Sequence, residues 1–416
     1  MPDLDLAGHL FDTLAARTRR GRGIERDSYG AGEQLGHDIV AEAARALGLA
    51  IAIDAIGNLT MTLPGRDRAV PRVLMGSHLD SVPQGGNFDG AAGVVAGLAI
   101  LSGWRQRGLT PARDLAVMAI RAEESAWFDV AYLGSAGAFG LLDPACLGVR
   151  RADDGRTLED ALTAGGFDPG AVRDRRRLLD PAGIAAYLEL HIEQAPVLVH
   201  RDRPVAVVTG IRGCRRLRHV RCLGATGHSG ALPRAYRQDA VAASVALLGR
   251  LERAWQAREA AGEDLVVTTG EFTTDPAQHG PSKVAGETRF VIDIRSVSDR
   301  TMEAFEAEVR AHAAAVAAEY RVTFALGDAT YSPPAVMDDG VRRALAAGMA
   351  TLGLPPEAMA SGAGHDAATF AAMGVPTGMI FVRNRNGSHN PDEAMDMADF
   401  ALATRALAEA VAVLAG

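Results

Sequence analysis

Five short segments of the sequence combine histidine, aspartate and glutamate, each beside a segment typical of a strand or at the start of a helix. They span residues 76–80, 85–90, 121–124, 189–194 and 386–391. Imidazole nitrogens and carboxylate oxygens suit a divalent ion such as zinc, manganese or cobalt. Because ligands of an open parallel sheet bind beyond the carboxyl ends of its strands, we expect these segments to meet in one crevice.

The segments divide into two groups of candidate metal ligands that share one carboxylate. Asp89 lies on a glycine-flanked turn, where close approach is possible, so we expect it to be the bridge. One site would contain His78, Asp89 and His191, and the other would contain Asp89, Glu124 and His389. Two ions about 3.5–4 Å apart need such a bridge and can activate one shared water. The predicted cofactors are therefore a pair of divalent ions per chain, zinc or one of manganese, cobalt and nickel.

Two further carboxylates are expected to act beside the ligands. Asp80 follows His78 by two residues and can accept the second N–H of that histidine, which would orient the ring. Glu123 should point away from its ligand neighbour Glu124, take a proton from the bridging water and deliver it to the leaving nitrogen. Each feature alone has an ordinary interpretation: an exposed pair, a solvated helix face, or a half-buried strand histidine at His191. Their recurrence at successive strand ends favours the metal centre.

The elements that must position these residues alternate between helix and strand patterns. Such alternation predicts a mostly parallel sheet that is covered on both faces by helices, an α/β fold. We expect helices at 5–20, 32–48 and 91–108, a strand pair at 50–63 broken at Gly57-Asn58, and strands at 73–77, 115–121, 185–192 and 377–382.

A second pattern begins near residue 211 and reads β-α-β-β-α-β. It predicts a compact α+β insertion with four strands and two helices. The expected elements are strand 217–223, helix 234–260, strands 265–273 and 287–296, helix 299–317 and strand 322–326. We therefore predict a catalytic domain formed by residues 1–211 and 331–416, with a lid or dimerisation domain inserted at 212–330.

Composition narrows the class of protein. The chain has 416 residues, 48% of them hydrophobic, and a formal net charge of −8, which argues against nucleic acid as the main partner. The three cysteines form no disulfide-type pattern, and the longest apolar stretch is far too short to span a membrane. The amino-terminal residues lack the basic start and apolar core of a signal peptide. A cytoplasmic enzyme is the expectation.

The same motifs resemble those of the M20 metallopeptidase clan, and more narrowly its hydantoinase/carbamoylase branch. This branch includes N-carbamoyl-L-amino-acid hydrolases, β-ureidopropionases and allantoate amidohydrolases. His191 favours it, since the peptidase branches usually carry a carboxylate at that position. The matching stretches are GSHLDSVPQGGNFDGAAGV (76–94), AEES (122–125), LELHIEQAPVL (188–198), GATGHSGALP (224–233), SGAGHDA (361–367) and GSHNPDEAM (387–395).

The resemblance implies a homodimer formed through the inserted domain, a pair of divalent metals, and hydrolysis of a ureido or amide group next to a carboxylate. It implies that Gln194 contacts the substrate and that His228 reaches across the dimer to stabilise the tetrahedral intermediate. Arg295 would clamp the substrate carboxylate through its bidentate guanidinium. The backbone of Gly362 and Ala363 would line the same pocket.

The sequence departs from the family pattern at two places. Lys283 stands where the family has an asparagine that touches the substrate, and residues 125–127 replace the usual Gly-Ser-Arg. A lysine there could favour a more anionic substrate, or it could simply point to solvent. An N-carbamoyl amino acid or related ureido acid is the expected substrate. An aminoacylase or dipeptidase acting on a plain amide, and a non-catalytic metal-binding homologue, are the alternatives.

Overall fold

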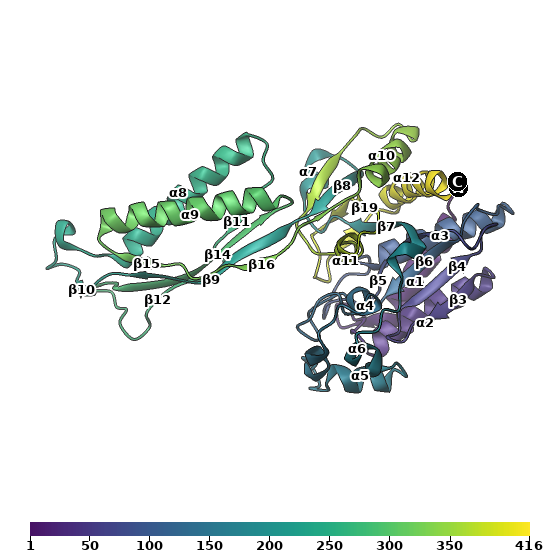
Figure 1. Ribbon diagram of the computed structural model, residues 1–416, viewed down its shortest axis with the longest axis horizontal. Helices are drawn as coiled ribbons and strands as arrows, with labels where there is room; N and C mark the ends of the chain where they lie inside the picture. Colours follow the sequence, from purple (N-terminus) through teal and green to yellow (C-terminus); the bar gives the residue numbers. More distant parts are fainter. The chain divides into compact units, whose positions relative to one another are not determined.

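The computed structural model describes residues 1–416 and divides into two compact units (Figure 1). The first unit contains residues 1–209 and 336–416, and the second contains residues 210–335. The second unit therefore interrupts the chain of the first. None of the helices combines the length and apolar character that a membrane crossing requires.

The first unit is built on a nine-stranded mixed sheet. Its order is β17-β8-β19-β7-β5-β6-β4-β3, with β18 beside β8. The strands are β3 (Ala50–Ile53), β4 (Leu59–Leu63), β5 (Arg72–His78), β6 (Leu115–Ile120), β7 (Ile184–Ile192), β8 (Val205–Ile211), β17 (Ala335–Val336), β18 (Ala358–Ser361) and β19 (Thr377–Val382). Short two-stranded ribbons are formed by β1 (Arg19–Arg20) with β2 (Gly23–Ile24), and by β20 (Asn384–Arg385) with β21 (Ala394–Met395).

The expectation of a mostly parallel sheet is correct only for the centre of this sheet. The neighbours β19, β7, β5 and β6 run parallel. On one side, β4 is antiparallel to both β6 and β3, and on the other side β8 is antiparallel to β19. The physical reason is the connection: β3 and β4 are joined by a short turn at Gly57-Asn58, which permits only an antiparallel pair.

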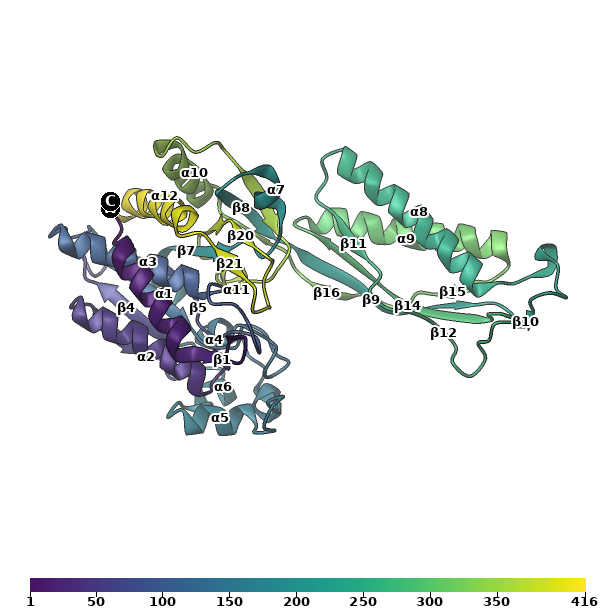
Figure 2. The same cartoon turned by 180° about the vertical axis from the view of Figure 1, so that it is seen from behind.

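Helices cover both faces of this sheet. On one face, α3 (Ala91–Gln106) contacts β5, β6 and β7, and α10 (Asp339–Thr351) and α12 (Met397–Ala415) pack beside it. The helix α1 (Leu4–Thr18) packs against both α3 and α2 (Ala31–Ala46) (Figure 2). On the other face lie α4 (Leu133–Ala138) and α11 (Asp366–Ala372), where Phe370 stacks on Tyr187 with ring centroids 3.7 Å apart. The short helices are α5 (Leu158–Ala164), α6 (Pro169–Arg173) and α7 (Val197–Arg201).

Close packing of α3 on the sheet brings the ligand-bearing strand ends together. The sequence of α3 is rich in alanine and glycine, and its first thirteen residues, from Ala91 to Gly103, are all buried. At Gly93 a Cβ atom would lie 2.5 Å from the carbonyl oxygen of Leu190 on β7, so only glycine allows this approach.

The second unit is a six-stranded antiparallel sheet with two long helices on one face (Figures 1 and 2). Its elements are β9 (Gly213–Leu223), α8 (Ala240–Ala260), β11 (Val266–Thr268), β12 (Phe272–Thr274), β14 (Glu287–Ser296), α9 (Asp299–Tyr320), β15 (Thr323–Ala325) and β16 (Thr330–Ser332). Phe290, Ile292 and Ile294 of β14 form a core with Phe305 and Val309 of α9. A separate ribbon pairs β10 (Gly227–His228) with β13 (Lys283–Val284).

The sequence-based prediction of four strands differs from this sheet for a simple reason. Both edge positions are divided between two short strands, since β11 and β12 pair with β14, and β15 and β16 pair with β9. The predicted helix 234–260 also starts too early. The chain forms a short 3-10 turn at Arg234–Tyr236, and α8 begins only after Asp239, whose carboxylate accepts the backbone N–H groups of Val241 and Ala242.

The buried histidine of α2 should make stability depend on pH. His37 is 2% exposed, and neither ring nitrogen has a hydrogen-bond partner. Burial, aided by the Arg121 charge, lowers its pKa well below the ordinary value. As the pH falls through about 6.5, the unfolded chain binds a proton at this histidine, whereas the folded chain does not. The free energy of unfolding is therefore unaffected by His37 above about pH 6.5 and decreases below it.

We expect His37→Leu to flatten this pH dependence. Between about pH 6.5 and pH 5 the parent's free energy of unfolding should fall more steeply than the variant's, by up to about 1.4 kcal/mol per pH unit. Chemical denaturation at several pH values measures both slopes. His9→Leu, which changes an exposed histidine of α1, is the control. Parallel slopes for parent and His37→Leu would show that this ring does not set the acid limit.

Candidate metal centre

The central strands of the first unit deliver the predicted ligands to one place. His78 is the last residue of β5, Glu124 follows β6, and His191 lies near the end of β7. Asp89 stands just before α3, and His389 lies in the loop after β20. Because β5, β6 and β7 are adjacent parallel strands, their carboxyl ends open at the same edge of the sheet.

The first group of ligand atoms gathers around one oxygen of Asp89. His191 Nε2 lies 3.2 Å from Asp89 Oδ1, and His78 Nε2 lies 3.7 Å from the same oxygen. All three side chains are buried. With metal–ligand bonds of about 2.0–2.2 Å, ligand atoms on a shared tetrahedral ion stand roughly 3.4 Å apart. The observed spacings match that value.

The second group gathers around the other oxygen of Asp89. His389 Nε2 lies 3.6 Å from Asp89 Oδ2 and 3.2 Å from Glu124 Oε1. The ligand atoms of each group fall within 4.8 Å of one another. The structure therefore brings together both predicted groups, and the two oxygens of Asp89 face different groups, as a bridging carboxylate requires.

The hydrogen-bond partners of the two histidines favour a cation between these atoms. His191 Nδ1 is 2.9 Å from the carbonyl oxygen of Ile192, and His78 Nδ1 is 3.1 Å from the carbonyl oxygen of Asp80. A carbonyl can only accept, so each Nδ1 carries the proton in the neutral ring and each Nε2 presents a lone pair. Both Nε2 atoms lie within 3.7 Å of Asp89 Oδ1, a buried oxygen that accepts no hydrogen bond, and His191 Nε2 also accepts the N–H of Gly90 at 3.2 Å. A divalent ion fits this set of donors.

The electrostatics of the site also favour positive charge. For Asp89, burial alone would raise the pKa, but contact with His191, His78 and the hydroxyl of Ser388 lowers it below its ordinary value. For His78, burial opposes protonation, yet the hydrogen bond with Asp80 and the carboxylates around the ring raise its pKa well above 6.5. Without a metal, protons must supply the cationic charge that these carboxylates require.

Asp80 contacts the backbone of a neighbouring turn in addition to His78, the partner predicted from the sequence. Its Oδ1 is 3.2 Å from His78 Nδ1, as predicted for an orienting carboxylate. The same oxygen accepts the backbone N–H of Glu123 at 3.0 Å, and Oδ2 accepts that of Glu124 at 3.1 Å. Ser28 Oγ donates to Oδ2 at 2.6 Å. Asp80 therefore links two of the ligand-bearing strand ends.

Glu123 lies beside both ligand groups. Its Oε2 is 3.9 Å from His78 Nε2, and its side chain is close enough to His78 and Glu124 to form a further cluster of possible ligands. Burial, reinforced by the Glu124 carboxylate against the opposing charge of His78, raises the pKa of Glu123 well above its ordinary value. A raised pKa suits a carboxyl group that must carry a proton during a reaction.

A fourth cluster, formed by Glu189, His191 and His365, is less suited to a metal. Glu189 already accepts hydrogen bonds from Ser77 Oγ at 2.7 Å and from the backbone N–H of Ala367 at 2.9 Å. His365 Nε2 is hydrogen-bonded to a serine hydroxyl at 2.9 Å. These satisfied groups pack behind His191, whose ring centroid is 4.4 Å from that of His365.

The loops around the centre adopt backbone conformations that few residues tolerate. Gln194 and His389 have φ values of 64° and 59°, in the left-handed region. Gly90 has φ of 65°, and a Cβ atom there would lie 2.5 Å from the His78 ring, so this position requires glycine. Such conformations persist only where surrounding contacts fix them, and here the side chains of Gln194 and His389 both lie close to Asp89.

The substrate residues expected in the first unit lie in two loops. Gln194 Nε2 donates to Asp89 Oδ2 at 2.9 Å, so the predicted substrate contact is in the structure a contact with the shared carboxylate. Gly362 and Ala363 lie between β18 and α11. The carbonyl oxygen of Ala363 accepts a hydrogen bond of 2.8 Å from Ser361.

The remaining candidates belong to the second unit and are described within it. His228 of β10 pairs directly with Lys283 of β13, and both side chains are exposed. His228 Nδ1 accepts the backbone N–H groups of Gly230 and Ala231 at 3.2 and 3.1 Å, which leaves its Nε2–H as an outward donor. Arg295 of β14 contacts Asp293 two residues earlier, with Nη2 3.0 Å from the carboxylate.

Sequence reasoning missed several residues that shape the site. Ser388 donates to Asp89, and Asp366 accepts a hydrogen bond from Ser135 at 2.6 Å. Both stand inside the stretches 387–395 and 361–367, so those motifs carried the signal. Glu33 is different, because its partner Ala122 is 89 positions away and no local pattern marks it.

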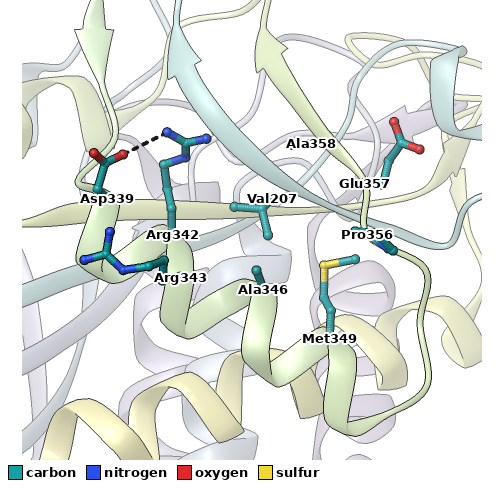
Figure 3. Close-up of a pocket in the computed structure, with 9 residues that line it drawn as sticks. All are labelled: Val207, Asp339, Arg342, Arg343, Ala346, Met349, Pro356, Glu357 and Ala358. Carbon is teal, nitrogen blue, oxygen red and sulfur yellow. Dashed lines mark hydrogen bonds and ion pairs between the residues drawn. The ribbon is translucent and has the colours of Figure 1, made fainter.

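A groove of about 300 Å³ on the first unit is separate from these residues (Figure 3). It lies between β8 and α10, with an apolar floor that includes Val207 and Met349. At one end Arg342 pairs with Asp339 at 3.1 Å. None of the predicted site residues lines this groove, so it carries no part of the candidate centre.

The family match, the sequence relatives and the structural relatives of the chain agree with one another. Residues 74–413 of the chain match the family described as peptidase family M20/M25/M40. The chain is 33% identical over 394 residues to N-carbamoyl-L-amino acid amidohydrolase of Geobacillus stearothermophilus, covering 94% of each. It is 33% identical over 368 residues to allantoate amidohydrolase of Escherichia coli (strain K12), covering 87% of this chain and 86% of that one. A hydantoinase/carbamoylase family amidase from Burkholderia ambifaria is similar in structure, with a TM-score of 0.86, 32% identity and coverage of 99% and 98%.

Proposed function

Because the chain belongs to peptidase family M20/M25/M40, as its motifs indicated, we propose that it is an amidohydrolase that cleaves the C–N bond of N-carbamoyl amino acids or related ureido acids. The observation that carries the proposal is the shared carboxylate of Asp89, with each oxygen facing a different group of ligands. The relatives that match most of the chain are named for carbamoyl amino acids and allantoate, both of which contain a ureido group.

The proposed cofactors are a pair of divalent ions, zinc or one of manganese, cobalt and nickel. His78, Asp89 and His191 would hold one ion, and Asp89, Glu124 and His389 would hold the other. Ions bound there would supply Lewis acidity for the scissile carbonyl and for water. Asp80 would keep the Nε2 lone pair of His78 directed into the site through its contact with Nδ1.

Glu123 is the proposed general base and acid. Its carboxylate would take a proton from the attacking water and then release it to the leaving nitrogen. Its buried position, next to His78 but in neither Asp89-centred group, leaves an oxygen available for that transfer.

Substrate recognition is also part of the proposal. In this proposal Arg295 binds the substrate carboxylate, Gln194 contacts the ureido group, and the backbone of Gly362 and Ala363 lines the pocket. His228 would act from the partner subunit of a homodimer formed through residues 210–335, and its Nε2–H would stabilise the tetrahedral intermediate. Lys283 stands opposite His228 in the β10–β13 ribbon, where its charge would favour a substrate with a second anionic group.

A substrate panel tests the proposed function. Carbamoyl, formyl and acetyl derivatives of the same amino acids, together with allantoate, should be assayed with enzyme reloaded with zinc, manganese, cobalt or nickel. Release of ammonia from the carbamoyl compounds or allantoate is expected. Activity confined to acetyl derivatives or dipeptides would replace the proposal with a plain-amide hydrolase, and metal binding without turnover of any compound would indicate a non-catalytic homologue.

Replacing Arg295 should mainly weaken substrate binding. Arg295→Ala removes a charge-assisted hydrogen bond worth about 1.5–3 kcal/mol, so kcat/KM should fall by roughly one to two decades, chiefly through KM. Arg295→Lys should not fully restore it, since an ammonium lacks the two-pronged geometry. Steady-state kinetics on carboxylate-bearing substrates measures the change.

The same strand provides a matched control for Arg295. Arg289 of β14 is exposed and pairs with Glu287 two residues earlier, just as Arg295 pairs with Asp293. Arg289→Ala should therefore leave kcat/KM nearly unchanged. Full activity of Arg295→Ala on carboxylate-bearing substrates would show that the acid group is recognised elsewhere.

A further inference from the structure

The turn that carries Glu123 and Glu124 is held on its N–H side by side chains, while the carbonyl oxygens of residues 121–123 accept backbone N–H groups of residues 132–134. Each backbone N–H from residue 121 to residue 124 is accepted by a side-chain oxygen: Arg121 by Asn58 at 2.9 Å, Ala122 by Glu33 at 2.8 Å, and the next two by Asp80. The turn follows β6 directly, so these contacts decide where the chain goes when it leaves the sheet.

The turn also contains a strained residue. Ala122 has φ of 49°, a left-handed conformation that costs an L-residue with a Cβ roughly 1–2 kcal/mol. Its side chain is 0% exposed and packs in an apolar cluster with Trp127 and Phe128. A conformation of this kind relaxes unless neighbouring groups fix it. The residue that follows it is Glu123, so relaxation would displace the proposed base and its neighbouring ligand.

Glu33 is the side chain that holds the N–H of this residue, whose carbonyl oxygen accepts the N–H of Leu133 at 3.0 Å. It lies in the first turn of α2 and is 0% exposed. Its Oε1 accepts the N–H of Ala122, and its Oε2 accepts the N–H of Tyr29 at 2.7 Å and Arg121 Nη1 at 3.2 Å. The guanidinium of Arg121 also donates to the carbonyl oxygen of Gly57 at 3.0 Å. One buried carboxylate thus ties the turn to α2 and to the β3–β4 hairpin.

We infer that Glu33 is a positioning residue for the reaction, which acts by holding Ala122 in its left-handed conformation and so directs Glu123 and Glu124 into the centre. This inference rests on the proposed function. Glu33 contacts none of the proposed ligands, whereas Asp80, which holds the other half of the turn, also touches His78. Glu33 is therefore the position where the geometry of the turn can be altered without removing a side-chain contact to a proposed ligand.

Glu33→Gln tests the inference with little change in volume. An amide can offer one oxygen, so at least one of the donors from Tyr29, Ala122 and Arg121 would face an NH2 group. We expect kcat to fall about 10–100-fold with little change in KM, and affinity for zinc to weaken by about 10-fold in a chelator competition assay. The control is Glu42→Gln, an exposed glutamate of the same helix, which should behave as the parent.

The measurements separate positioning from stability. They are made at a temperature where circular dichroism shows the variant to be folded, and kcat is measured on whichever substrate the parent hydrolyses. If Glu33→Gln does not fold, Glu33→Asp decides, because it keeps the charge opposite Arg121 but is one methylene too short to keep both ends of the contact. A folded variant with kcat and zinc affinity within about 2-fold of the parent overturns the inference. If the parent hydrolyses no substrate, the proposed function fails, and the zinc affinity still tests Glu33.

Discussion

Glu123→Gln is expected to abolish nearly all turnover while leaving the metal content and the fold unchanged. Glutamine keeps the size and polarity of the side chain but cannot take a proton from water or return one to the leaving nitrogen. General acid–base groups contribute about 10²–10⁴-fold, and this residue would act twice in one cycle, so kcat should fall by at least that range. Steady-state kinetics and metal analysis of the same preparation measure both quantities.

The neighbouring residue gives this experiment its control. Glu124 lies 3.2 Å from His389 and belongs to a ligand group, whereas Glu123 belongs to neither group centred on Asp89. Glu124→Gln should therefore lose metal together with activity, and Glu123→Gln should lose activity alone. A Glu123→Gln variant with kcat close to the parent would show that another group moves the proton.

The juxtaposition of the candidate ligands could be predicted from sequence because most of them have a strong local signal. His78, Glu124 and His191 follow or end runs of buried apolar residues, and the runs themselves predict central parallel strands. Once the strands are parallel neighbours, the polar residues at their ends must share an edge. Asp89 could be chosen as the bridge because glycines flank it, and Gly90 indeed leaves room for the ring of His78.

The features of the site and of the sheet that could not be predicted from sequence depend on partners that are far away along the chain. Glu33 reads as an ordinary glutamate in the first turn of a helix, and only the fold places it against Ala122. The strand direction of β8 could not be predicted for the same reason. This strand is antiparallel because it pairs with β19, which lies more than 160 positions later in the chain. A local pattern reports burial and period, but it does not report which strand a segment will join.

Asp89→Asn should have the second large effect, because it changes both ligand groups at once. Asparagine has nearly the same shape, but it is neutral and offers one oxygen in place of two equivalent ones. The negative charge that lies 3.2 Å from His191 and 3.6 Å from His389 would disappear, and the NH2 group would face one of these histidines. We expect metal content to fall from about two ions per chain to less than one, with loss of detectable turnover.

The comparison with single-group variants decides whether Asp89 is shared. Glu124→Gln touches only the group with His389, and His191→Gln touches only the group with His78, so each should retain about one ion per chain. Elemental analysis of the three variants beside the parent gives the pattern directly. If Asp89→Asn retained as much metal as Glu124→Gln, the carboxylate would serve one ion, and the second group of ligands would need another explanation. If the fully active parent held no more than one ion, the paired centre itself would be wrong, because the shared oxygens of Asp89 would then have no second ion to join.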